Sequence, residues 1–362
     1  MRYPYIIVCK NYNKVGVYMI TIDGSQKSGS GTIVRCAVAL ASLLGEEIKI
    51  ENIRAKRDKP GLRAQHLGAI LACKEMCQGT VENAYVGSRE IRFRPGRRIK
   101  GGEYNWDIGT AGSTTMLAQT FLPLACFADS TSISKIQGGL FQDFAPSFYH
   151  MKFALVHLLR QMGVAAQLEM IRPGYVPTGK GIIEIKVEPA REIKPLTLLE
   201  QGEIKAIKGI AISSHLEQKK VSHRMSQKCK EVLASHGYKA EIQEIYDTSS
   251  LQEGAALAIY AETSSNSKIG SDRAGRPGRS SESIGNHVAE SLLQDLRTGA
   301  AVDRFVADQL IIYAALAEGI TKYSVPRMTE HIETNLWLVE EILGAKTGFR
   351  DNIVEVQGVG FA

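Results

Sequence analysis

The residues best suited to chemistry lie between positions 22 and 67, where a glycine-rich turn opens an apolar helix and a strand then leads into a run of cations. The turn contains Gly24, Gly29 and Gly31. Backbone amides at a helix start favour anions because they are unsatisfied donors at the positive end of the helix dipole. Five cations follow within ten residues, diluted only by Asp58: Arg54, Lys56, Arg57, Lys59 and Arg63. This density suits a polyanion better than a single phosphate, so the segment indicates an enzyme that handles phosphate on a substrate with many phosphates.

A histidine near the end of the chain is a second candidate. His331 lies in MTEHIETNLWLVEEILG, where Thr329 precedes it and Asn335 follows one helical turn later. Imidazole is nucleophilic when neutral near pH 7 and leaves readily once protonated. Taken alone, the residues favour a simpler interpretation, a histidine at the start of an amphipathic helix with its ring hydrogen-bonded.

A second cation run reads IRFRPGRRIK and contains no acid. Its charged members are Arg92, Arg94, Arg97, Arg98 and Lys100. One such run fits a solvated hairpin as well as it fits a binding surface. Two runs upstream of the same helix-rich segment favour contacts with nucleic-acid phosphates, although the net charge of the chain is only +6.

Three common sites are excluded by spacing. GYVPTGKG (174–181) spells most of a P-loop, but Gly181 stands where Ser or Thr must bind magnesium, and a strand follows instead of a helix. The pair Gly29 and Gly31 lacks the third glycine of a dinucleotide-binding fingerprint. Cys73 and Cys77 are four apart, without a histidine or a second cysteine pair at zinc spacing, so core packing is the better interpretation.

The elements that position these residues alternate between helices and strands. The apolar pattern predicts helices at about 32–44, 63–77, 113–127 and 146–162, and β-like runs at 48–53, 81–86, 90–95 and 132–137. Helices that alternate with strand pairs predict α/β units whose sheets are covered by helices. With 44% apolar residues in 362, the chain has the composition of a globular protein with a sizeable core.

A change of composition after Pro189 predicts a second unit. Residues 190–280 are rich in Lys, Glu, Gln and Ser and carry strands at 204–213, 240–246 and 255–262 with a polar helix at 217–235. We expect a mobile basic loop at 271–283 and a helix from Ile284 that returns to the main body.

No apolar run approaches a membrane span, and the first eighteen residues lack the features of a signal peptide. A cytoplasmic protein is therefore expected.

Five blocks of this chain, in order, resemble the RNA 3′-terminal phosphate cyclase family. They are IDGSQKSGSGTIVR (22–35), IRAKRDKPGLRAQH (53–66), DIGTAGS (107–113), AAVDRFVADQL (300–310) and EHIETN (330–335). The resemblance covers roughly residues 20–343. It implies an α+β/α/β fold with a large domain of repeated βαβαββ units, at 19–188 and 284–362, and a smaller inserted α+β domain at 189–283. Residues 1–18 would be an N-terminal extension.

The resemblance also implies a reaction. A cyclase takes AMP from ATP onto the histidine that matches His331, releasing pyrophosphate, and passes it to an RNA 3′-phosphate. The neighbouring 2′-hydroxyl then attacks the activated phosphorus, which releases AMP and leaves a 2′,3′-cyclic phosphate. ATP and a divalent metal, Mg or Mn, are the implied cofactors. RNA with a 3′-phosphate end is the implied partner, and neither a membrane nor a stable protein partner is inferred.

The resemblance also implies roles for the residues of this chain that occupy the family's motif positions. The catalytic set would be His331 with Arg35, Arg54 and Arg57, because arginine forks can hold a terminal phosphate and neutralise developing charge. Gln119 and the segment Phe305, Val306, Ala307, Asp308 and Gln309 would bind ATP. Without the resemblance, this segment fits an ordinary amphipathic helix. Gln65 and His66 match family positions that line the active site, and we assign them, with Arg97 and Arg98 from the second cation run, to RNA.

Several positions depart from the family pattern. Ser28 replaces the family glutamate implicated in metal handling, so the metal ligands are unknown, and Ser30 replaces a glycine. Ala64 stands where many relatives have arginine. In the segment 137–150, Leu140, Ser147 and Tyr149 do not match the family pattern. These departures bear on metal use and RNA-end binding more than on nucleotidyl transfer.

Two other functions fit parts of the pattern. A non-catalytic, cyclase-like RNA-binding protein of ribosome assembly would, as the family implies, lack the nucleophilic histidine that His331 supplies here. An enolpyruvyl transferase of related architecture fits the α/β alternation but explains neither the cation runs nor the histidine motif.

Overall fold

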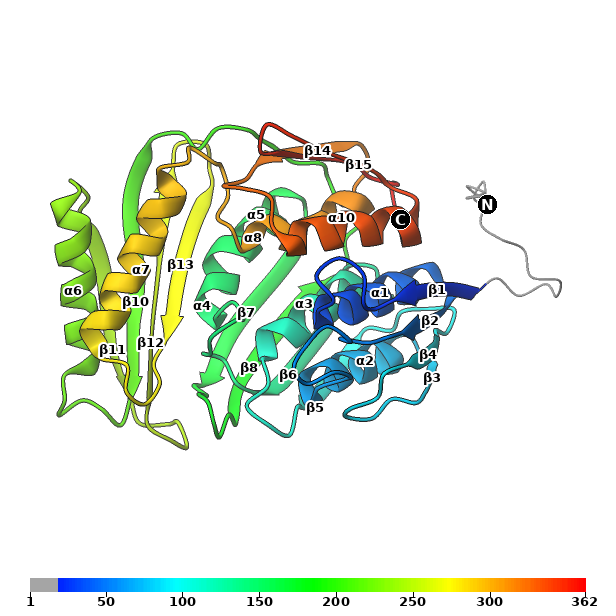
Figure 1. Ribbon diagram of the computed structural model, residues 1–362, viewed down its shortest axis with the longest axis horizontal. Coiled ribbons are helices and arrows are strands. Elements are labelled where there is room, and N and C mark those ends of the chain that lie inside the picture. The colour runs from blue at the N-terminus through cyan, green and yellow to red at the C-terminus, as the bar shows by residue number, and fades with distance from the viewer. Residues whose placement is uncertain (1–18) are drawn as a thin grey trace.

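The computed structural model of the protein describes residues 19–362, and the expected N-terminal extension at 1–18 lies outside the described residues. The described residues form four sheets of four strands each, with helices packed against them (Figure 1). The predicted mixed α/β class is confirmed. In this part of the chain no helix is both long and apolar enough to cross a membrane.

The first sheet has the strand order β1-β2-β4-β3, with β1 and β2 parallel and the remaining pairs antiparallel. Helix α1 begins where Ser30 accepts a hydrogen bond from the Thr32 amide, and it ends at Gly45 in the left-handed conformation. The predicted strand 81–86 is cut short, because the chain turns at Asn83 with φ +59°. The elements are β1 (Met19–Asp23), α1 (Gly31–Leu44), β2 (Glu47–Glu51), α2 (Ala64–Met76), β3 (Thr80–Glu82) and β4 (Ile91–Arg94).

The second sheet repeats this pairing pattern in the order β5-β6-β8-β7. The predicted helix at 146–162 is divided, because a π-helical turn at Met151–Leu155 separates two shorter helices. The elements are β5 (Gly102–Asp107), α3 (Thr114–Cys126), β6 (Ser132–Gly138), α4 (Phe148–His150), α5 (Val156–Gln161), β7 (Ala165–Arg172) and β8 (Gly181–Glu188).

The third sheet is assembled from two distant parts of the chain. Strand β9 (Thr197–Leu198) pairs in parallel with β14 (Ile320–Ser324), although a long segment separates them in sequence. The strand order β15-β16-β14-β9 follows the same pairing pattern again. Its other elements are α8 (Val306–Gln309), α9 (Ile311–Leu316), α10 (Glu330–Leu343), β15 (Lys346–Arg350) and β16 (Ile353–Gln357).

The segment between β9 and β14 forms the fourth sheet, with the order β11-β10-β12-β13. It has an apolar core of its own, shared with the two helices that cover it. Figure 1 shows this unit at one end of the molecule. The elements are β10 (Ile204–Ser214), α6 (Val221–Ser235), β11 (Ala240–Asp247), β12 (Gly254–Thr263), β13 (Lys268–Ala274) and α7 (Ser281–Leu296).

Two expectations for this segment are wrong. The helix from Ile284 packs, as part of α7, on α6 and on the fourth sheet instead of returning to the main body, because its apolar side belongs to that sheet's core. The basic segment 271–283 is no free loop. Its first residues pair with β12 in strand β13, its last begin α7, and Arg279 between them is held by Asp143.

One large apolar core joins the other three sheets, and α1 lies within it with nearly all its residues buried. Cys73, Cys77 and Cys126 pack in this core as free thiols, as the sequence predicts. Helix α1 contacts α2, α3 and α10. Side chains at the beginnings of these helices can therefore meet at one place.

Candidate active site

The beginnings of four helices converge in the structure. The glycine-rich turn before α1 contacts the first turn of α10, where the Ser28 amide donates to Thr334 Oγ1 at 3.2 Å and Lys27 pairs with Glu333 at 2.9 Å. The first turn of α2 meets that of α3, because Gln65 Oε1 accepts from the Ser113 amide at 3.1 Å. Four positive helix ends directed at one region favour a polyanion there.

His331 occupies the second position of α10 and is exposed on one side. Its Nδ1 lies 3.4 Å from Thr32 Oγ1 in the first turn of α1. Desolvation by the surrounding protein, followed by the charges of Arg35 and Arg57, lowers the pKa of His331 below its usual 6.5. The ring is therefore neutral near pH 7, the form in which imidazole is a nucleophile.

Arg35 is a buried cation with few partners. The residue is only 8% exposed, and its guanidinium donates a 3.4 Å hydrogen bond to Thr32 Oγ1. Among the described residues, no carboxylate lies within 4 Å of its guanidinium. Burial lowers the pKa of Arg35, and Cys36 and Asp308 oppose that shift only in part. A bound anion would supply the missing compensation.

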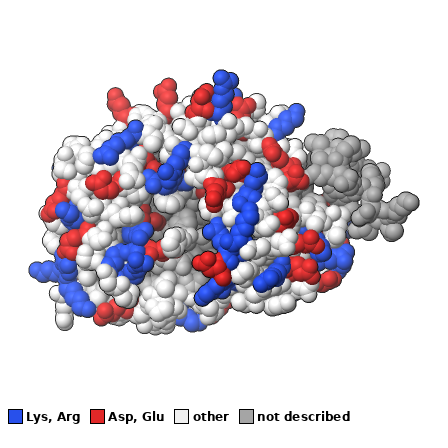
Figure 2. Space-filling view, in the orientation of Figure 1, with Lys and Arg blue, Asp and Glu red and all other residues white. Residues whose placement is uncertain are grey.

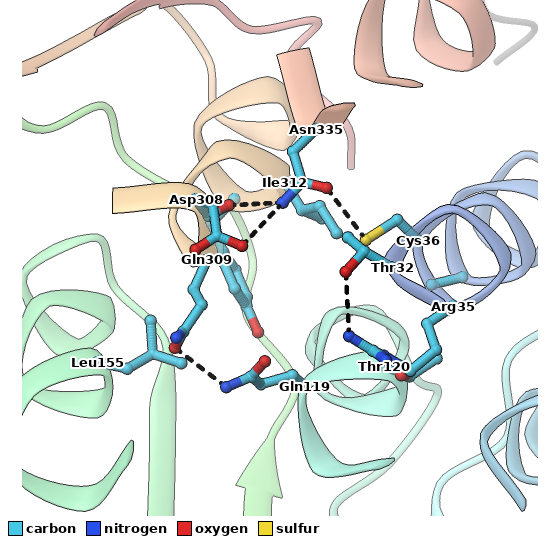
Figure 3. Close-up of a pocket in the computed structure, with 12 residues that line it drawn as sticks. Thr32, Arg35, Cys36, Gln119, Thr120, Leu155, Asp308, Gln309, Ile312 and Asn335 are labelled. Carbon is cyan, nitrogen blue, oxygen red and sulfur yellow. Dashed lines mark hydrogen bonds between the residues drawn. The ribbon is translucent and has the colours of Figure 1, made fainter. Parts of the chain in front are cut away.

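A cavity of about 40 Å³ lies among these helices. Figure 3 shows side chains from α1, α3, α8 and α10 directed into it. Asn335 Nδ2 donates to the Asp308 carbonyl at 2.8 Å, and Gln119 Nε2 donates to Gln309 Oε1 at 3.0 Å. The volume suits a few water molecules, so a nucleotide must displace side chains such as these two glutamines. The lining residues are Thr32, Arg35, Cys36, Ala39, Gln119, Thr120, Leu155, Asp308, Gln309, Ile312, Tyr313 and Asn335.

Among the described residues, Asp308 is the only acid that lines the cavity. Burial raises its pKa to about 7, although Arg35 acts in the opposite direction. Its side chain is partly enclosed, and Asn335 Nδ2 lies 3.5 Å from its Oδ2. Near neutral pH this carboxyl is divided between its charged and neutral forms, which suits a group that meets phosphate oxygens as a donor.

The other side chains of the predicted ATP-binding segment lie in different surroundings, some in the core and one at the surface. Val306 and Ala307 are fully buried core residues, so only their backbone could meet a ligand. Phe305 is exposed, and its ring lies edge-on to His150 at 5.6 Å between centroids. The carboxylate of Asp303 accepts from the Phe305 and Val306 amides, both at 2.9 Å, and this fixes the start of α8.

His66 packs against the glycine-rich turn. Its Nδ1 accepts from the Arg63 amide at 3.1 Å, and a Cβ at Gly31 would lie 2.0 Å from its Nε2. Glycine is thus required at position 31 for this close approach. Desolvation, followed by Arg35, Arg54 and Arg63, lowers the pKa of His66 well below its usual value, which keeps the ring neutral.

The two predicted cation runs lie in different places. In the first, Arg57 donates to the Ser28 carbonyl at 3.0 Å, and Arg54 donates to the carbonyls of Lys59 and Gly61 at 2.6 and 2.8 Å. Arg57 thereby stands beside the turn that faces His331. Figure 2 shows basic side chains gathered beside a hollow on this face of the molecule.

Arg97 and Arg98 are exposed, but the structure does not bring them to the cavity. The neighbouring Gly96 packs against Cys77, which ends α2, and lies near Gly45, which ends α1. The cavity lies at the opposite ends of these helices. With 14 residues, α1 separates the two places by about 20 Å.

The donor set does not fit a resident metal. The described residues contain no group of three or more His, Cys, Asp or Glu side chains that could hold an ion. Ser28 is buried, and its hydroxyl lies 3.0 Å from that of Ser30 and accepts from Thr334 Oγ1 at 2.9 Å. A neutral hydroxyl so engaged is a poor ligand for a hard cation.

Sequence reasoning missed several lining residues. Thr32 bridges Arg35 and His331. The only feature of the sequence that could have indicated it is its position two residues after the helix cap Ser30. Cys36 and Tyr313 are residue types common in a hydrophobic core, so their sequence gives no sign of a site, but both line the cavity. Tyr149, noted as a departure, is buried and stacks on Phe153 at 6.0 Å, so it serves the core.

Comparison with known proteins agrees with the motifs. Residues 26–349 match the family described as RNA 3′-terminal phosphate cyclase. Proteins of that name are similar over nearly the whole chain. The one from Pyrococcus furiosus is 39% identical over 326 residues, which cover 90% of this chain and 94% of that protein. The one from Caldivirga maquilingensis is 37% identical over 332 residues, covering 90% and 93%.

Among solved structures, the enolpyruvyl transferase NikO from Streptomyces tendae aligns with 96% of this chain and 49% of its own. Its TM-score is 0.39 at 11% identity, a likeness from which we argue nothing.

Proposed function

Because the chain belongs to the RNA 3′-terminal phosphate cyclase family, we propose that it uses ATP to convert an RNA 3′-phosphate end into a 2′,3′-cyclic phosphate. The family predicted from the five motifs is confirmed. One observation carries the proposal. A neutral histidine and a buried, underpaired arginine, which lie almost 300 residues apart in sequence, meet at one hydroxyl, that of Thr32.

The first step is transfer of AMP to His331. With its proton on Nδ1 donating to Thr32 Oγ1, the ring keeps the lone pair of Nε2 for attack on the α-phosphorus of ATP. The bond from that phosphorus to the bridging oxygen breaks, and pyrophosphate leaves. Arg35 and Arg57 neutralise the charge that develops on the phosphate oxygens. Gln119 and the segment 305–309 bind the rest of the nucleotide.

The second and third steps take place on the RNA. An oxygen of the 3′-phosphate attacks the phosphorus of the histidine adduct, the N–P bond breaks, and His331 leaves as neutral imidazole with its proton still on Nδ1, as the RNA-adenylate anhydride forms. The neighbouring 2′-hydroxyl then attacks the 3′-phosphorus, loses its proton to solvent, and expels AMP. Because this last step is intramolecular, the ribose itself supplies proximity. Gln65 and His66, at the start of α2 beside the glycine-rich turn, are the residues that we assign to the RNA end.

The divalent cation enters this proposal with ATP. Mg or Mn carried on the triphosphate needs no three-ligand protein site, and Ser28 offers none. No step of the mechanism above depends on a metal held by the protein.

We also propose an architecture. The three sheets that share one pairing pattern correspond to three βαβαββ units. The smaller domain, predicted at 189–283, is inserted into the third unit between β9 and β14, so it begins after Leu198. The packing of α7 on the fourth sheet supports an inserted unit that extends to Leu296.

A defined RNA tests the proposed activity. An oligonucleotide with a 3′-phosphate is incubated with ATP, and its end is then treated with phosphatase. We expect ATP-dependent protection of the phosphate, with release of AMP and pyrophosphate. An oligonucleotide with a 2′-deoxy terminal ribose is the matched control: because it lacks the attacking hydroxyl, it should stop at the adenylate and release pyrophosphate without AMP. An end that stays sensitive to phosphatase with the ribose substrate would contradict the proposal.

A further inference from the structure

Phe144, outside the active site, has an aromatic ring that is almost completely exposed to solvent. Phe144, in the loop between β6 and α4, is 98% exposed. Its backbone has φ +66°, a conformation that is uncommon for a bulky residue other than glycine and costs free energy. The exposed ring recovers nothing by burial. Folding alone gives no reason for this residue in this conformation.

The loop that carries Phe144 is fixed on both sides. On the side of α3, Thr115 Oγ1 donates to the Pro146 carbonyl at 2.7 Å. On the side of the fourth sheet, Arg279 makes two bonds to the carboxylate of Asp143, at 2.9 and 2.8 Å. The Ser147 amide donates to Asp272 at 2.7 Å. These contacts hold the ring at a defined place between the two parts of the molecule.

Arginines surround the base of this loop. Arg273 and Arg276 approach Asp143 at 3.4 and 3.7 Å, in addition to Arg279. One carboxylate cannot neutralise three guanidinium groups, and with Asp272 included the cluster keeps a net positive charge. Arg276 is the most accessible of the three, with a side chain 66% exposed. An accessible aromatic ring therefore stands next to one accessible cation, Arg276, and a partly exposed one, Arg273.

The loop lies beside the active site. Thr115, which holds it, is in the first turn of α3, one turn before Gln119 in the cavity. In Figure 2 basic side chains lie on both sides of the hollow in this face. Figure 1 places β13 and α7 across from the beginnings of α1 and α10.

We propose that Phe144, Arg276 and Arg273, on the loop support that Arg279 anchors, form a platform for single-stranded RNA just upstream of the reacting 3′ end. The inference rests on the proposed function and adds to it a site for the body of the substrate. An exposed aromatic ring stacks a base, and adjacent arginines bind the backbone phosphates, the combination by which proteins hold single strands with little sequence preference. The charge of the cluster favours RNA over an apolar protein surface.

The test compares affinity for two lengths of RNA. A single-stranded 3′-phosphorylated decamer and a 3′-phosphorylated dinucleotide are titrated against wild type and Phe144→Ala. We expect decamer affinity to fall by about 5- to 100-fold while dinucleotide affinity stays within about twofold. Phe144→Trp should retain decamer binding. Arg276→Gln should flatten the salt dependence of decamer binding by about 0.7 in the log–log slope.

Tyr85→Ala is the matched control, because Tyr85 is also an exposed aromatic residue, at 61%, on another loop. It should bind both RNAs as wild type does. Equal decamer affinity in wild type and Phe144→Ala, or an equal loss on both lengths, would overturn the platform. Incubation with labelled ATP in the absence of RNA separates the two ideas. Failure of wild type to form an AMP adduct contradicts the proposed function, whereas an adenylating wild type with RNA affinity insensitive to Phe144 contradicts the platform alone.

Discussion

The two cation runs look alike in sequence and differ in the structure. In the run at 91–100, carboxylates hold most of the charges: Arg92 and Arg94 both pair with Glu47, Arg94 also pairs with Glu82, and Lys100 pairs with Asp129. In the run at 54–63, no described carboxylate lies within 4 Å of a charged nitrogen. Arg54 and Arg57 bond to backbone carbonyls instead.

The difference shows which charge is available for a ligand. Ion pairs engage Arg92, Arg94 and Lys100 of the second run, and pairs of that kind add little stability. Arg97 and Arg98 have no carboxylate within 4 Å among the described residues, but they lie about one helix length from the cavity. The first run stands uncompensated beside four positive helix ends and the buried Arg35. Repulsion among these groups is tolerated in the folded protein, and a polyanion would relieve it. Unpaired charge, more than charge density, identifies the candidate site.

The largest effect should come from Arg35. Replacing Arg35 with Gln removes the buried cation that faces the phosphates, and we expect self-adenylation to fall by about 100-fold or more. Arg92→Gln, at an arginine already paired with Glu47, is the matched control and should stay within about twofold of wild type. Adduct formation from labelled ATP measures both, and a thermal melt shows whether Arg35→Gln is folded. Similar losses in the two variants would remove the distinction between the runs.

Arg57 should matter less, and its loss should change the pH dependence. We expect Arg57→Gln to adenylate about tenfold more slowly, the scale of one charged hydrogen bond. Only neutral His331 attacks, so the rate should fall as pH drops through its pKa, which lies below 6.5. Removing the Arg57 charge raises that pKa and should move the acidic limb to higher pH. Adenylation rates measured from pH 5 to 8 check this. An unmoved limb would show that Arg57 does not act on His331.

Position 28 tests the metal requirement. Ser28 should leave the enzyme dependent on relatively high concentrations of divalent metal, because ATP must bring the ion itself. A carboxylate in the turn, in Ser28→Glu, should lower the concentration for half-maximal adenylation by about a factor of a few. Ser28→Gln is a control of similar size without the charge. Superimposable metal titrations of wild type and Ser28→Glu would show that this position does not handle metal.

The smallest effect should come from Arg97 and Arg98, which stand about one helix length from the cavity. Neutralising both should reduce RNA affinity less than about tenfold and flatten the log–log salt slope by about 1.4, since each phosphate contact contributes about 0.7 through counterion release. Self-adenylation should survive. Arg350→Gln removes another exposed arginine as the control. If RNA binding and its salt slope are unchanged while ATP use falls, the assignment of these two arginines to RNA is wrong.

Local patterns in the sequence predicted most of the elements but not their long-range contacts. The long apolar runs placed α1, α2 and α3 within a residue or two, because α1 and α3 are buried almost throughout and cap residues such as Ser30 and Ser113 mark where they begin. They could not show that Glu47 neutralises Arg92 and Arg94, since that pairing depends on strand register. The prediction of a mobile loop at 271–283 was wrong for a similar reason, because Asp143, which is distant in sequence, forms an ion pair with Arg279.

The candidate site was predicted through motifs more than through physics. Read alone, His331 favoured a structural role, and nothing local indicated Thr32 as its neighbour. The resemblance to a family grouped His331, Arg35 and Gln119, and the fold places Arg35 and Gln119 in the lining of one cavity, with His331 in contact with the lining residue Thr32. Arg97 and Arg98, chosen by charge density alone, lie away from it.

The central claim is that His331 is the nucleophile, and one measurement tests it most directly. Purified protein is incubated with α-labelled ATP, denatured, and analysed for covalent AMP, beside His331→Ala and a control variant at His223, an exposed histidine of α6 that is paired with Glu244. We expect an acid-labile adduct on wild type and on His223→Ala, and none on His331→Ala, whose thermal melt should match wild type. An undiminished adduct on His331→Ala would contradict the account.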